Sequence, residues 1–409
     1  MANFKNIFSV AMLGCLAVNA HGQITRNQVG GGELNTITTS VPFLMISPDS
    51  RAGGMGDAGV ASSPDANSMH WNPAKYAFID KDMGFSMSYV PWLRRLVPDI
   101  SLSYLTGYKK IGKDQVVAGS LRYFSLGDIT FTDINGNVTG QFRPNEFAFD
   151  AGYSRKLSKE FSGGIAFRYI YSNLTNGQVV GGNTTKPGQT VAADVAGYYT
   201  KDGIKLGDKK GKINAGLNIS NIGGKIRYSD AAYADFIPIN MKLGGGLTVN
   251  LDDYNSFTFL LDANKLLVPT SPIYEVDAQG QIVRDPNGNP VVAQGADPNR
   301  TVPAGMFGSF SDAPGGGKEE LREFYYSTGV EYWYDNLLAV RGGFFYEHPT
   351  KGNRKYATLG LGLRYNAFGL DFSYLIPTTQ NNPLQNTLRF TLVFNFDKAQ
   401  KADTDATTE

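Results

Sequence analysis

The stretch LRFTLVFNF, residues 388–396, has a large apolar side chain at every second position. Successive side chains of a β-strand point to opposite faces. One face therefore carries Leu388, Phe390, Leu392, Phe394 and Phe396, and the other carries Arg389, Thr391, Val393 and Asn395. A wholly apolar face backed by a mixed face predicts a strand of a transmembrane β-barrel, which has lipid on one side and the lumen on the other.

The same alternation recurs along the chain in segments of roughly ten residues, the length that a tilted spanning strand requires. We expect an all-β fold, a transmembrane antiparallel barrel of about fourteen strands, because closure pairs every backbone group between strands. The apolar faces of the earlier strands are marked by Phe85 and Met87, Leu102 and Tyr104, Val116 and Ala118, Phe147 and Phe149, Ile165 and Phe167, Val191 and Val195, Ile213 and Leu217, Leu243 and Leu247, Phe257 and Phe259, Val330 and Tyr332, Val340 and Phe344, Leu359 and Leu361, and Phe372 and Tyr374.

Composition and the N-terminus agree with an exported β-protein. The 409 residues include 48 Gly, 22 Tyr and 25 Phe, and only 18% are charged, which suits neither a helical bundle nor a disordered chain. Residues 1–22 are predicted to be a signal peptide, with Lys5 ahead of an apolar stretch that includes Cys15, the only cysteine. Without Lys5 the chain carries 37 basic and 37 acidic side chains, which gives no electrostatic case for nucleic acid.

Loop lengths divide the rest of the chain. We expect an N-terminal hatch at 23–82, a barrel at 83–397 with a long outer loop at 266–318, and a polar C-terminal tail at 398–409. Short turns are expected on the periplasmic side and longer loops outside. The expected short turns are 110–114, 157–161, 201–211, 251–254, 335–336 and 366–367, and the expected long loops are 127–145, 173–189, 221–237 and 266–318.

The faces that would line the lumen are charged but balanced. A strongly one-signed lumen would indicate an ion-selective pore, whereas a mixed lumen favours internal ion pairs or a bound plug. The basic positions are Arg168, Lys242, Arg341, Arg364 and Arg389, and the acidic positions are Asp150, Asp194, Asp262, Glu331 and Asp371.

Two motifs precede the first strand: SPDSRAGGMGDAGVA at 47–61 and DANSMHWNPA at 65–74. Both resemble the N-terminal hatch of the FadL-like outer-membrane barrels. Combined with FLMISPD at 43–49 and YVPWLR at 89–94, they resemble more narrowly the PorV (LptO) family of the Bacteroidetes type IX secretion system. The resemblance covers essentially the whole mature chain. The hatch residues that it singles out are Pro48, Asp49, Arg51, Gly54, Met55, Gly56, Asn72 and Pro73.

This resemblance implies an outer-membrane protein that binds the C-terminal signal domain of exported cargo. It also implies docking at the SprA/Sov translocon and delivery of cargo to the attachment complex that contains the PorU sortase. The expected surroundings are outer-membrane lipid, with no cofactor, metal or nucleic acid. An alternative from the broader superfamily is a transporter of hydrophobic small molecules.

The first outer loop is the candidate partner-binding segment, because exposed aromatic and Arg side chains are common binding anchors. Its alternative role is to place Trp92 in the aromatic girdle of the membrane interface. The candidate residues are Pro91, Trp92, Leu93, Arg94, Arg95 and Leu96. The Asn-Gly pairs at 135–136 and 287–288 favour tight hairpins in two further outer loops, which could also contact partners.

We expect no catalysis. The spacing Gly54-x-Gly56-x-x-Gly59 fits a dinucleotide fingerprint, but no strand and helix frame it. Asp65, Ser68 and His70 form the only compact triad-like cluster. A hydrolase would depend on Ser68 or His70, whereas an irregular hatch would use such residues for internal hydrogen bonds.

Overall fold

The structure, a computed structural model, describes residues 34–94, 97, 99–132, 135–180, 183–230, 234–286, 288–378 and 382–397. The expected signal peptide, the beginning of the expected hatch and the expected C-terminal tail lie outside the described residues, as do Arg95 and Leu96. Among the described helices, none is both long enough and apolar enough to cross a membrane.

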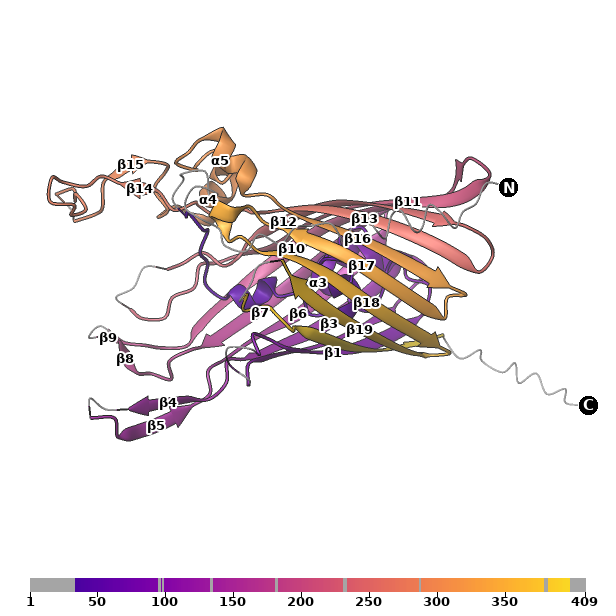
Figure 1. Cartoon of the computed structure of the whole chain (residues 1–409), viewed down its shortest axis with the longest axis horizontal. Coiled ribbons are helices and arrows are strands. Elements are labelled where there is room, and N and C mark those ends of the chain that lie inside the picture. Colours follow the sequence, from indigo (N-terminus) through magenta and orange to yellow (C-terminus); the bar gives the residue numbers. More distant parts are fainter. Residues whose placement is uncertain are drawn as a thin grey trace, which may run out of the picture.

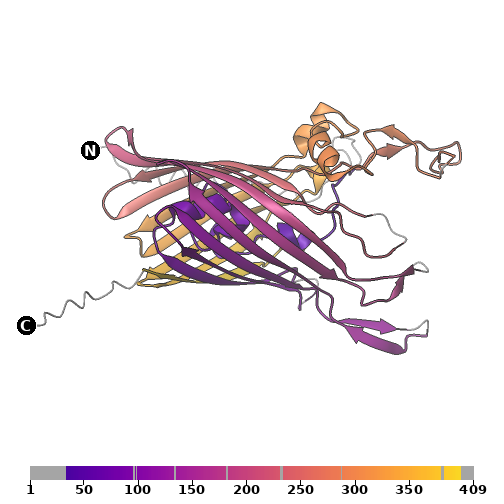
Figure 2. The same cartoon turned by 180° about the vertical axis from the view of Figure 1, so that it is seen from behind.

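The described strands form a closed antiparallel barrel of fourteen strands, which confirms the predicted fold (Figures 1 and 2). Each strand pairs with its neighbour in the chain, and β1 closes the barrel against β20, with Tyr89 opposite Phe390. The barrel strands are β1 (Met83–Pro91), β2 (Ser101–Lys110), β3 (Gln115–Ser125), β6 (Asn145–Lys156), β7 (Phe161–Asn173), β10 (Gly188–Leu206), β11 (Lys209–Gly223), β12 (Asn240–Asn250), β13 (Asn255–Leu266), β16 (Tyr325–Tyr334), β17 (Leu338–Tyr346), β18 (Lys355–Tyr365), β19 (Phe368–Pro377) and β20 (Leu388–Phe396).

Alternating burial follows the predicted phase in most strands. Phe167, Leu361 and Phe390 are exposed on the outer surface, while Arg389 and Thr391 are buried in the lumen. An apolar outer surface of this kind faces the hydrocarbon of the membrane.

The predicted phase is wrong in β2 and β3. Leu102, Tyr104 and Val116 are buried in the lumen, and Leu105 and Val117 face outward instead. The reason is that the inner faces of these strands also carry apolar residues, which pack against the N-terminal segment inside the barrel. A strand that is apolar on both faces leaves its phase open to a period-two pattern.

Short turns gather at one end of the barrel, which we call the periplasmic end, and longer loops gather at the other (Figure 1). The expected turn at 201–211 is shorter than predicted, since β10 and β11 continue until only residues 207–208 remain between them. Gly207 takes a φ of 64° there, and a register shift lies between Asp202 and Ile204.

The outer loops carry structure of their own. Two-stranded sheets are formed by β4 (Ile129–Thr132) with β5 (Val138–Phe142), β8 (Val179–Val180) with β9 (Asn183–Thr184), and β14 (Ile273–Tyr274) with β15 (Val292–Gln294). The long loop between β13 and β16 also contains α4 (Val302–Gly308) and α5 (Gly317–Arg322), and η3 (Pro349–Lys351) follows β17.

Residues 34–82 begin at the outer loops, where Asn35 contacts Thr350 and Ser271, and then run through the interior of the barrel, where Figures 1 and 2 show violet segments enclosed by strands. We call this segment the hatch. It contains η1 (Pro42–Met45), α2 (Ser50–Gly53), α3 (Ser68–Trp71) and η2 (Pro73–Phe78). Most of its side chains between 41 and 77 are buried, so it fills the lumen as a core fills a globular domain.

Candidate functional site

The hatch is held by caps at the start of its short helices. The Asp49 side chain accepts hydrogen bonds from the Ala52 backbone N–H at 2.9 Å and from Trp71 Nε1 at 2.6 Å. Asn72 accepts from the Ala74 N–H at 3.0 Å, with Pro73 at the first position of η2. The two motifs are therefore joined to each other, because Asp49 of the first contacts Trp71 of the second.

An ion-pair network fixes the hatch to the barrel wall. Arg51 donates to both oxygens of Glu331, at 3.0 and 2.8 Å, and pairs with Asp65 of the hatch at 2.9 Å. Glu331 also accepts from Arg341 at 2.7 Å, and Arg341 pairs with Asp371 at 2.8 Å. The side chains of this chain of pairs are buried, apart from a partly exposed Asp65. Buried charges in such an arrangement stabilise only when each has its partners, so the network specifies one position of the hatch.

Glycines let the hatch backbone touch the strands. A Cβ at Gly56 would lie 2.5 Å from the Phe344 backbone N, and Gly56 itself has a φ of 67°. Its N–H donates to Thr358 Oγ1 at 2.8 Å. From the barrel side, a Cβ at Gly343 would lie 2.1 Å from the backbone of Met55 and Gly56. The Gly-rich run that imitates a dinucleotide fingerprint thus serves close backbone approach.

Further hydrogen bonds join both hatch motifs to other strands of the barrel. Asn72 Nδ2 donates to the carbonyls of Val60 and Gly197, at 3.1 and 3.0 Å. Asp262 of β13 accepts from the backbone N–H groups of Gly59 and Val60, at 2.7 and 3.0 Å. These contacts join the hatch to β10 and β13.

The predicted lumen charges therefore divide between two networks, the contact of Asp262 with the hatch backbone, and the cavity described below. Arg341, Glu331 and Asp371 form the first network, which Arg364 extends by its pair with Asp371 at 2.5 Å. Arg168 is held by Asp150 and Asp194 in the second. Lys242 and Arg389 belong to neither network.

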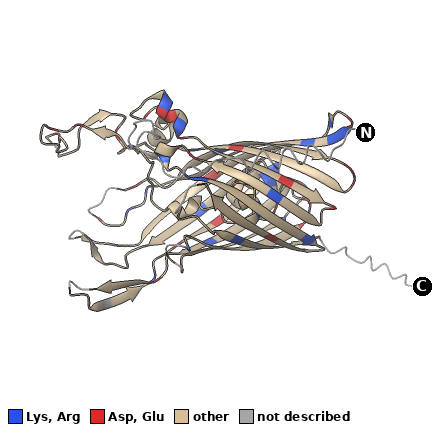
Figure 3. Ribbon diagram, viewed as in Figure 1, with Lys and Arg blue, Asp and Glu red and all other residues tan. Residues whose placement is uncertain are grey.

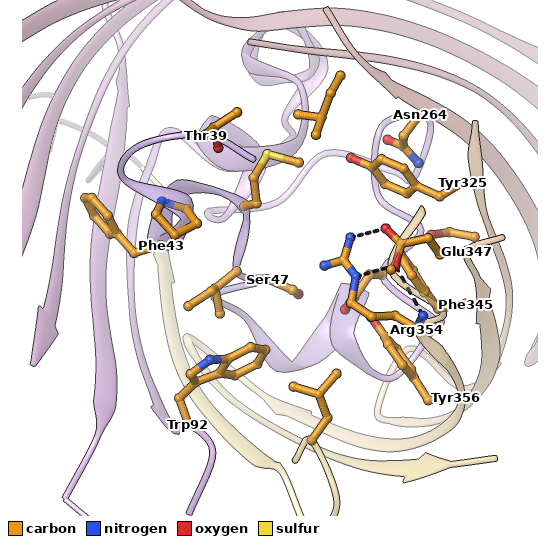
Figure 4. A pocket seen from close by; sticks show the side chains of 18 of the residues that line it. Thr39, Phe43, Ser47, Trp92, Asn264, Tyr325, Phe345, Glu347, Arg354 and Tyr356 are labelled. Atoms are coloured by element: carbon orange, nitrogen blue, oxygen red, sulfur yellow. Dashed lines mark hydrogen bonds and ion pairs between the residues drawn. The ribbon is translucent and has the colours of Figure 1, made fainter. Parts of the chain in front are cut away.

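Between the hatch and the outer loops lies a cavity of about 550 Å³ (Figure 4). Its wall combines apolar and aromatic side chains from the hatch, the strand ends and the first outer loop. These include Phe43, Met45, Trp92, Leu93, Phe124, Tyr325, Phe345 and Tyr356. A concave, mostly apolar site with a few polar groups is the usual form of a binding pocket.

Polar groups interrupt the wall in two places. On one side Arg354 and Glu347 form an ion pair at 2.7 Å, and Figure 4 shows both beside Phe345 and Tyr356. Toward the hatch, Arg389 lies 3.3 Å from Asp57, and the Nζ of Lys242 lies 4.5 Å from the ring centre of Trp71. Among the described residues, Lys242 has no ion pair, and its buried side chain belongs to the cavity lining.

The first outer loop contributes to this wall. Pro91 ends β1, and Trp92 and Leu93 are half-buried in the cavity lining, where they pack against the apolar cluster that contains both Tyr325 and Leu384. Figure 4 shows the Trp92 ring facing the cavity. Arg94 is exposed. The loop therefore places its aromatic side chain over the lumen and leaves an arginine beside it.

The triad-like cluster is not assembled for nucleophilic catalysis. Ser68 Oγ contacts Asp65 at 3.3 Å, but His70 Nδ1 lies 2.6 Å from Arg122 Nη2. Burial, with the nearby cations of Lys242, Arg122 and Arg168, lowers the pKa of His70 well below its ordinary value. His70 is a structural link between the hatch and β3. Among the described residues no His, Cys, Asp and Glu side chains gather as a metal site.

Several cavity residues were not singled out from sequence. Phe345, Tyr356 and Arg354 lie near the outer ends of β17 and β18, and Tyr325 begins β16. In the sequence they are ordinary members of alternating strands. The available signal was the combination of inward phase with an aromatic side chain at an outer strand end.

The closed barrel with an apolar outer surface defines the class of protein: it is an outer-membrane β-barrel. Residues 30–273 match the family described as type IX secretion system protein PorV, which is more than half of the chain. The chain belongs to this family and is thus an outer-membrane component of type IX secretion.

Solved structures with a similar fold include a channel, a transporter and a FadL homologue. The monoaromatic hydrocarbon channel CymD is 11% identical over 89% of this chain and 100% of its own, with a TM-score of 0.49. The toluene transporter TbuX of Ralstonia pickettii is 12% identical over 85% of this chain and 98% of its own, with a TM-score of 0.46. A FadL homologue of Pseudomonas aeruginosa is 11% identical over 88% of this chain and 99% of its own, with a TM-score of 0.43. Comparison with curated protein sequences gives no match.

Proposed function

We propose that this chain binds the C-terminal signal domain of exported cargo at the outer end of its barrel. The single observation that carries the proposal is membership of the type IX secretion family. The cavity supports it, because Trp92 and Leu93 line its wall and the exposed Arg94 follows them in the chain. Aromatic and Arg side chains of this kind dominate the binding energy of protein interfaces.

The same proposal includes two further partners. The chain docks at the SprA/Sov translocon to receive cargo and then carries it to the attachment complex with the PorU-type sortase. The structured outer loops offer surfaces for such docking, since Phe307 and Leu321 in the long loop are 78% and 70% exposed. Where exposed apolar side chains form a patch, the patch marks an interaction site.

The binding step is tested with purified components. A cargo C-terminal domain is titrated against the detergent-solubilised protein by isothermal calorimetry, for the wild type and for Trp92→Ala with Arg94→Ala. The double variant should weaken binding by about thirty-fold, since a central aromatic anchor contributes about 2 kcal/mol. Trp333→Ala is the matched control, because Trp333 lies at the periplasmic end of β16, and it should leave the affinity unchanged. Equal affinity of the wild type and the double variant would remove this loop from the proposed site.

The docking steps are tested in the native membrane. The tagged protein is purified in mild detergent and its partners are identified by mass spectrometry. Recovery of a very large barrel together with secreted proteins that share a C-terminal domain supports the proposal. Recovery of the protein alone, with only lipid or fatty acid bound, would replace it with the alternative function.

That alternative is transport of hydrophobic small molecules, and the apolar cavity is the observation in its favour. The hatch is the observation against it, because buried ion pairs join Arg51 and Glu331 below the cavity. Uptake of a labelled hydrophobic compound by proteoliposomes distinguishes the two: a transporter accelerates uptake, whereas a cargo-binding protein does not.

A further inference from the structure

The six periplasmic turns of the barrel form two groups of opposite charge. The turns that join β2 to β3, β6 to β7 and β10 to β11 lie within residues 109–114, 155–160 and 201–212, which contain eleven Lys and Arg against four Asp and Glu. The next three turns, within 250–255, 334–338 and 365–368, contain three Asp and no Lys or Arg. A net charge of +7 therefore stands opposite a net charge of −3.

Strand order makes each half continuous. The first three hairpins follow one another around the barrel from β2 to β11, and the other three follow from β12 to β19. We call the first half the basic arc. Its largest part is the β10–β11 hairpin, which extends beyond the start of β7, since the β10–β7 ladder ends where Tyr199 pairs with Phe161. Figure 3 shows blue segments on this protruding hairpin, at the end of the barrel where the turns are short.

One basic side chain of each hairpin points outward from the barrel. Lys109, Arg155 and Lys201 each follow a buried, lumen-facing residue, namely Tyr108, Ser154 and Thr200. Because the side chains of a strand alternate, the three basic residues lie on the face that meets lipid. They share this face with Leu105, Tyr153 and Tyr199, which lie further into the membrane.

These three cations are exposed and weakly paired. Among the described residues, Lys109 and Arg155 have no ion pair, and Lys201 lies 3.6 Å from Glu160 in a pair whose side chains are about half exposed. An exposed pair of this kind contributes little and yields readily to another anion. The tyrosines next to them mark the membrane interface, where ring and hydroxyl meet the headgroups.

We propose that the basic arc binds the phosphate headgroups of anionic phospholipids in the periplasmic leaflet of the outer membrane. The outward direction of Lys109, Arg155 and Lys201 places their charges beside lipid, and an anionic headgroup is the complementary partner at that depth. Basic residues clustered at a membrane surface attract anionic lipid within a Debye length. The acidic half of the rim repels the same lipids, so the annulus around the barrel is polarised. This inference is independent of cargo binding.

The test measures which lipids the protein retains. The full chain is reconstituted in nanodiscs of phosphatidylethanolamine and phosphatidylglycerol, released in mild detergent, and analysed by native mass spectrometry. The wild type should retain phosphatidylglycerol in excess of its share of the bilayer. Lys109→Gln, Arg155→Gln and Lys201→Gln combined should reduce this enrichment several-fold.

A matched triple variant at the outer end controls for net charge. Lys318→Gln, Arg322→Gln and Lys355→Gln remove the same three charges near the outer loops, and they should keep the enrichment. Heat-modifiable migration in gel electrophoresis shows that each barrel is folded. Unchanged enrichment in the rim variant, or an equal loss in both variants, would overturn the proposal. The proposal is supported if the rim variant alone loses the enrichment and if high salt causes the same loss in the wild type.

Discussion

The periplasmic half and the outer half of the lumen are built in opposite ways. Below the cavity, Arg51, Glu331 and Arg341 are buried and paired with one another and with neighbours on the hatch and wall. Above it, a space of about 550 Å³ remains between aromatic side chains, with Lys242 unpaired among the described residues. The periplasmic half of the lumen is therefore closed by the packed hatch, whereas the outer half holds an open cavity that can bind a partner.

The cost of separating buried ion pairs explains why the periplasmic half of the lumen stays closed. Each buried ion loses several kcal/mol of hydration, and this loss is offset only when its partners are in place. Moving the hatch would separate Arg51 from Glu331 and leave each of these buried charges with fewer partners. A binding role for the upper half is thus compatible with a permanently closed barrel, whereas transport through the lumen would require this network to open.

Removing Arg51 should have the largest effect on the difference between the two halves of the lumen, because it opens the closed half. Arg51→Ala leaves Asp65 and Glu331 without a shared partner, and loss of one member of a buried pair costs about 3–5 kcal/mol. The hatch should loosen while the fourteen barrel strands remain paired. Planar-bilayer recordings should then show ion conductance that the wild type lacks, and thermal unfolding should begin at lower temperature.

The control for Arg51 is an exposed ion pair. Lys81 pairs with Asp397 at 2.6 Å, but both side chains are about half or more exposed. Lys81→Ala should change stability by less than about 1 kcal/mol and leave the barrel closed. A silent Arg51→Ala variant, with no conductance and unchanged unfolding, would show that the network does not hold the hatch.

Two adjacent glycines of β17 test whether close backbone contact, in addition to charge, holds the hatch against the barrel. A Cβ at Gly343 would meet the hatch backbone at 2.1 Å, whereas a Cβ at Gly342 faces outward, with its nearest neighbour at 3.6 Å. Gly343→Ala should destabilise hatch docking by about 1–3 kcal/mol, the usual cost of overpacking. Gly342→Ala should have little effect. Thermal unfolding of both variants checks this, and equal behaviour of the pair would contradict the close approach.

The sequence predicted the barrel because alternation is a direct consequence of a lipid face, and β20 shows it in nearly pure form. It predicted β2 and β3 with the wrong phase, because Leu102 and Val116 are apolar residues that contact the hatch. A one-residue shift reverses every side chain of a strand. The inward and outward faces of such strands can be assigned only when the segment that fills the lumen is known.

The candidate site was predictable to a smaller degree. The motifs located the hatch residues, and Trp92 was singled out as an unusual aromatic residue in a loop. Tyr325 and Arg354 were not, because a cavity forms from residues far apart in the chain, and no local pattern records their meeting. The same limit hid the pairing of His70 with Arg122, which only the packed hatch brings together.

The smallest expected effect concerns the long outer loop above the cavity. Asp312 is buried there, and one of its oxygens accepts a hydrogen bond from the Thr270 N–H at 3.4 Å. Burial raises the pKa of Asp312 from 3.8 to about 6; the Thr270 hydrogen bond opposes this rise, and the carboxylates of Glu320 and Glu323 add to it. The docked loop therefore holds the proton of Asp312 more tightly than an opened loop does.

The sign of the pH effect follows from this. Docking of the loop is most favourable below pH 3.8, weakens as the pH rises toward about 6, and changes no further above that value, because Asp312 is then ionised in both states. Asp312→Asn removes this dependence. Limited proteolysis of the loop measures it, and the ratio of wild-type to variant cleavage cancels the pH dependence of the protease. The ratio should rise several-fold between pH 4 and pH 7, whereas a flat ratio would mean that Asp312 keeps an ordinary pKa and that the loop docks independently of its charge.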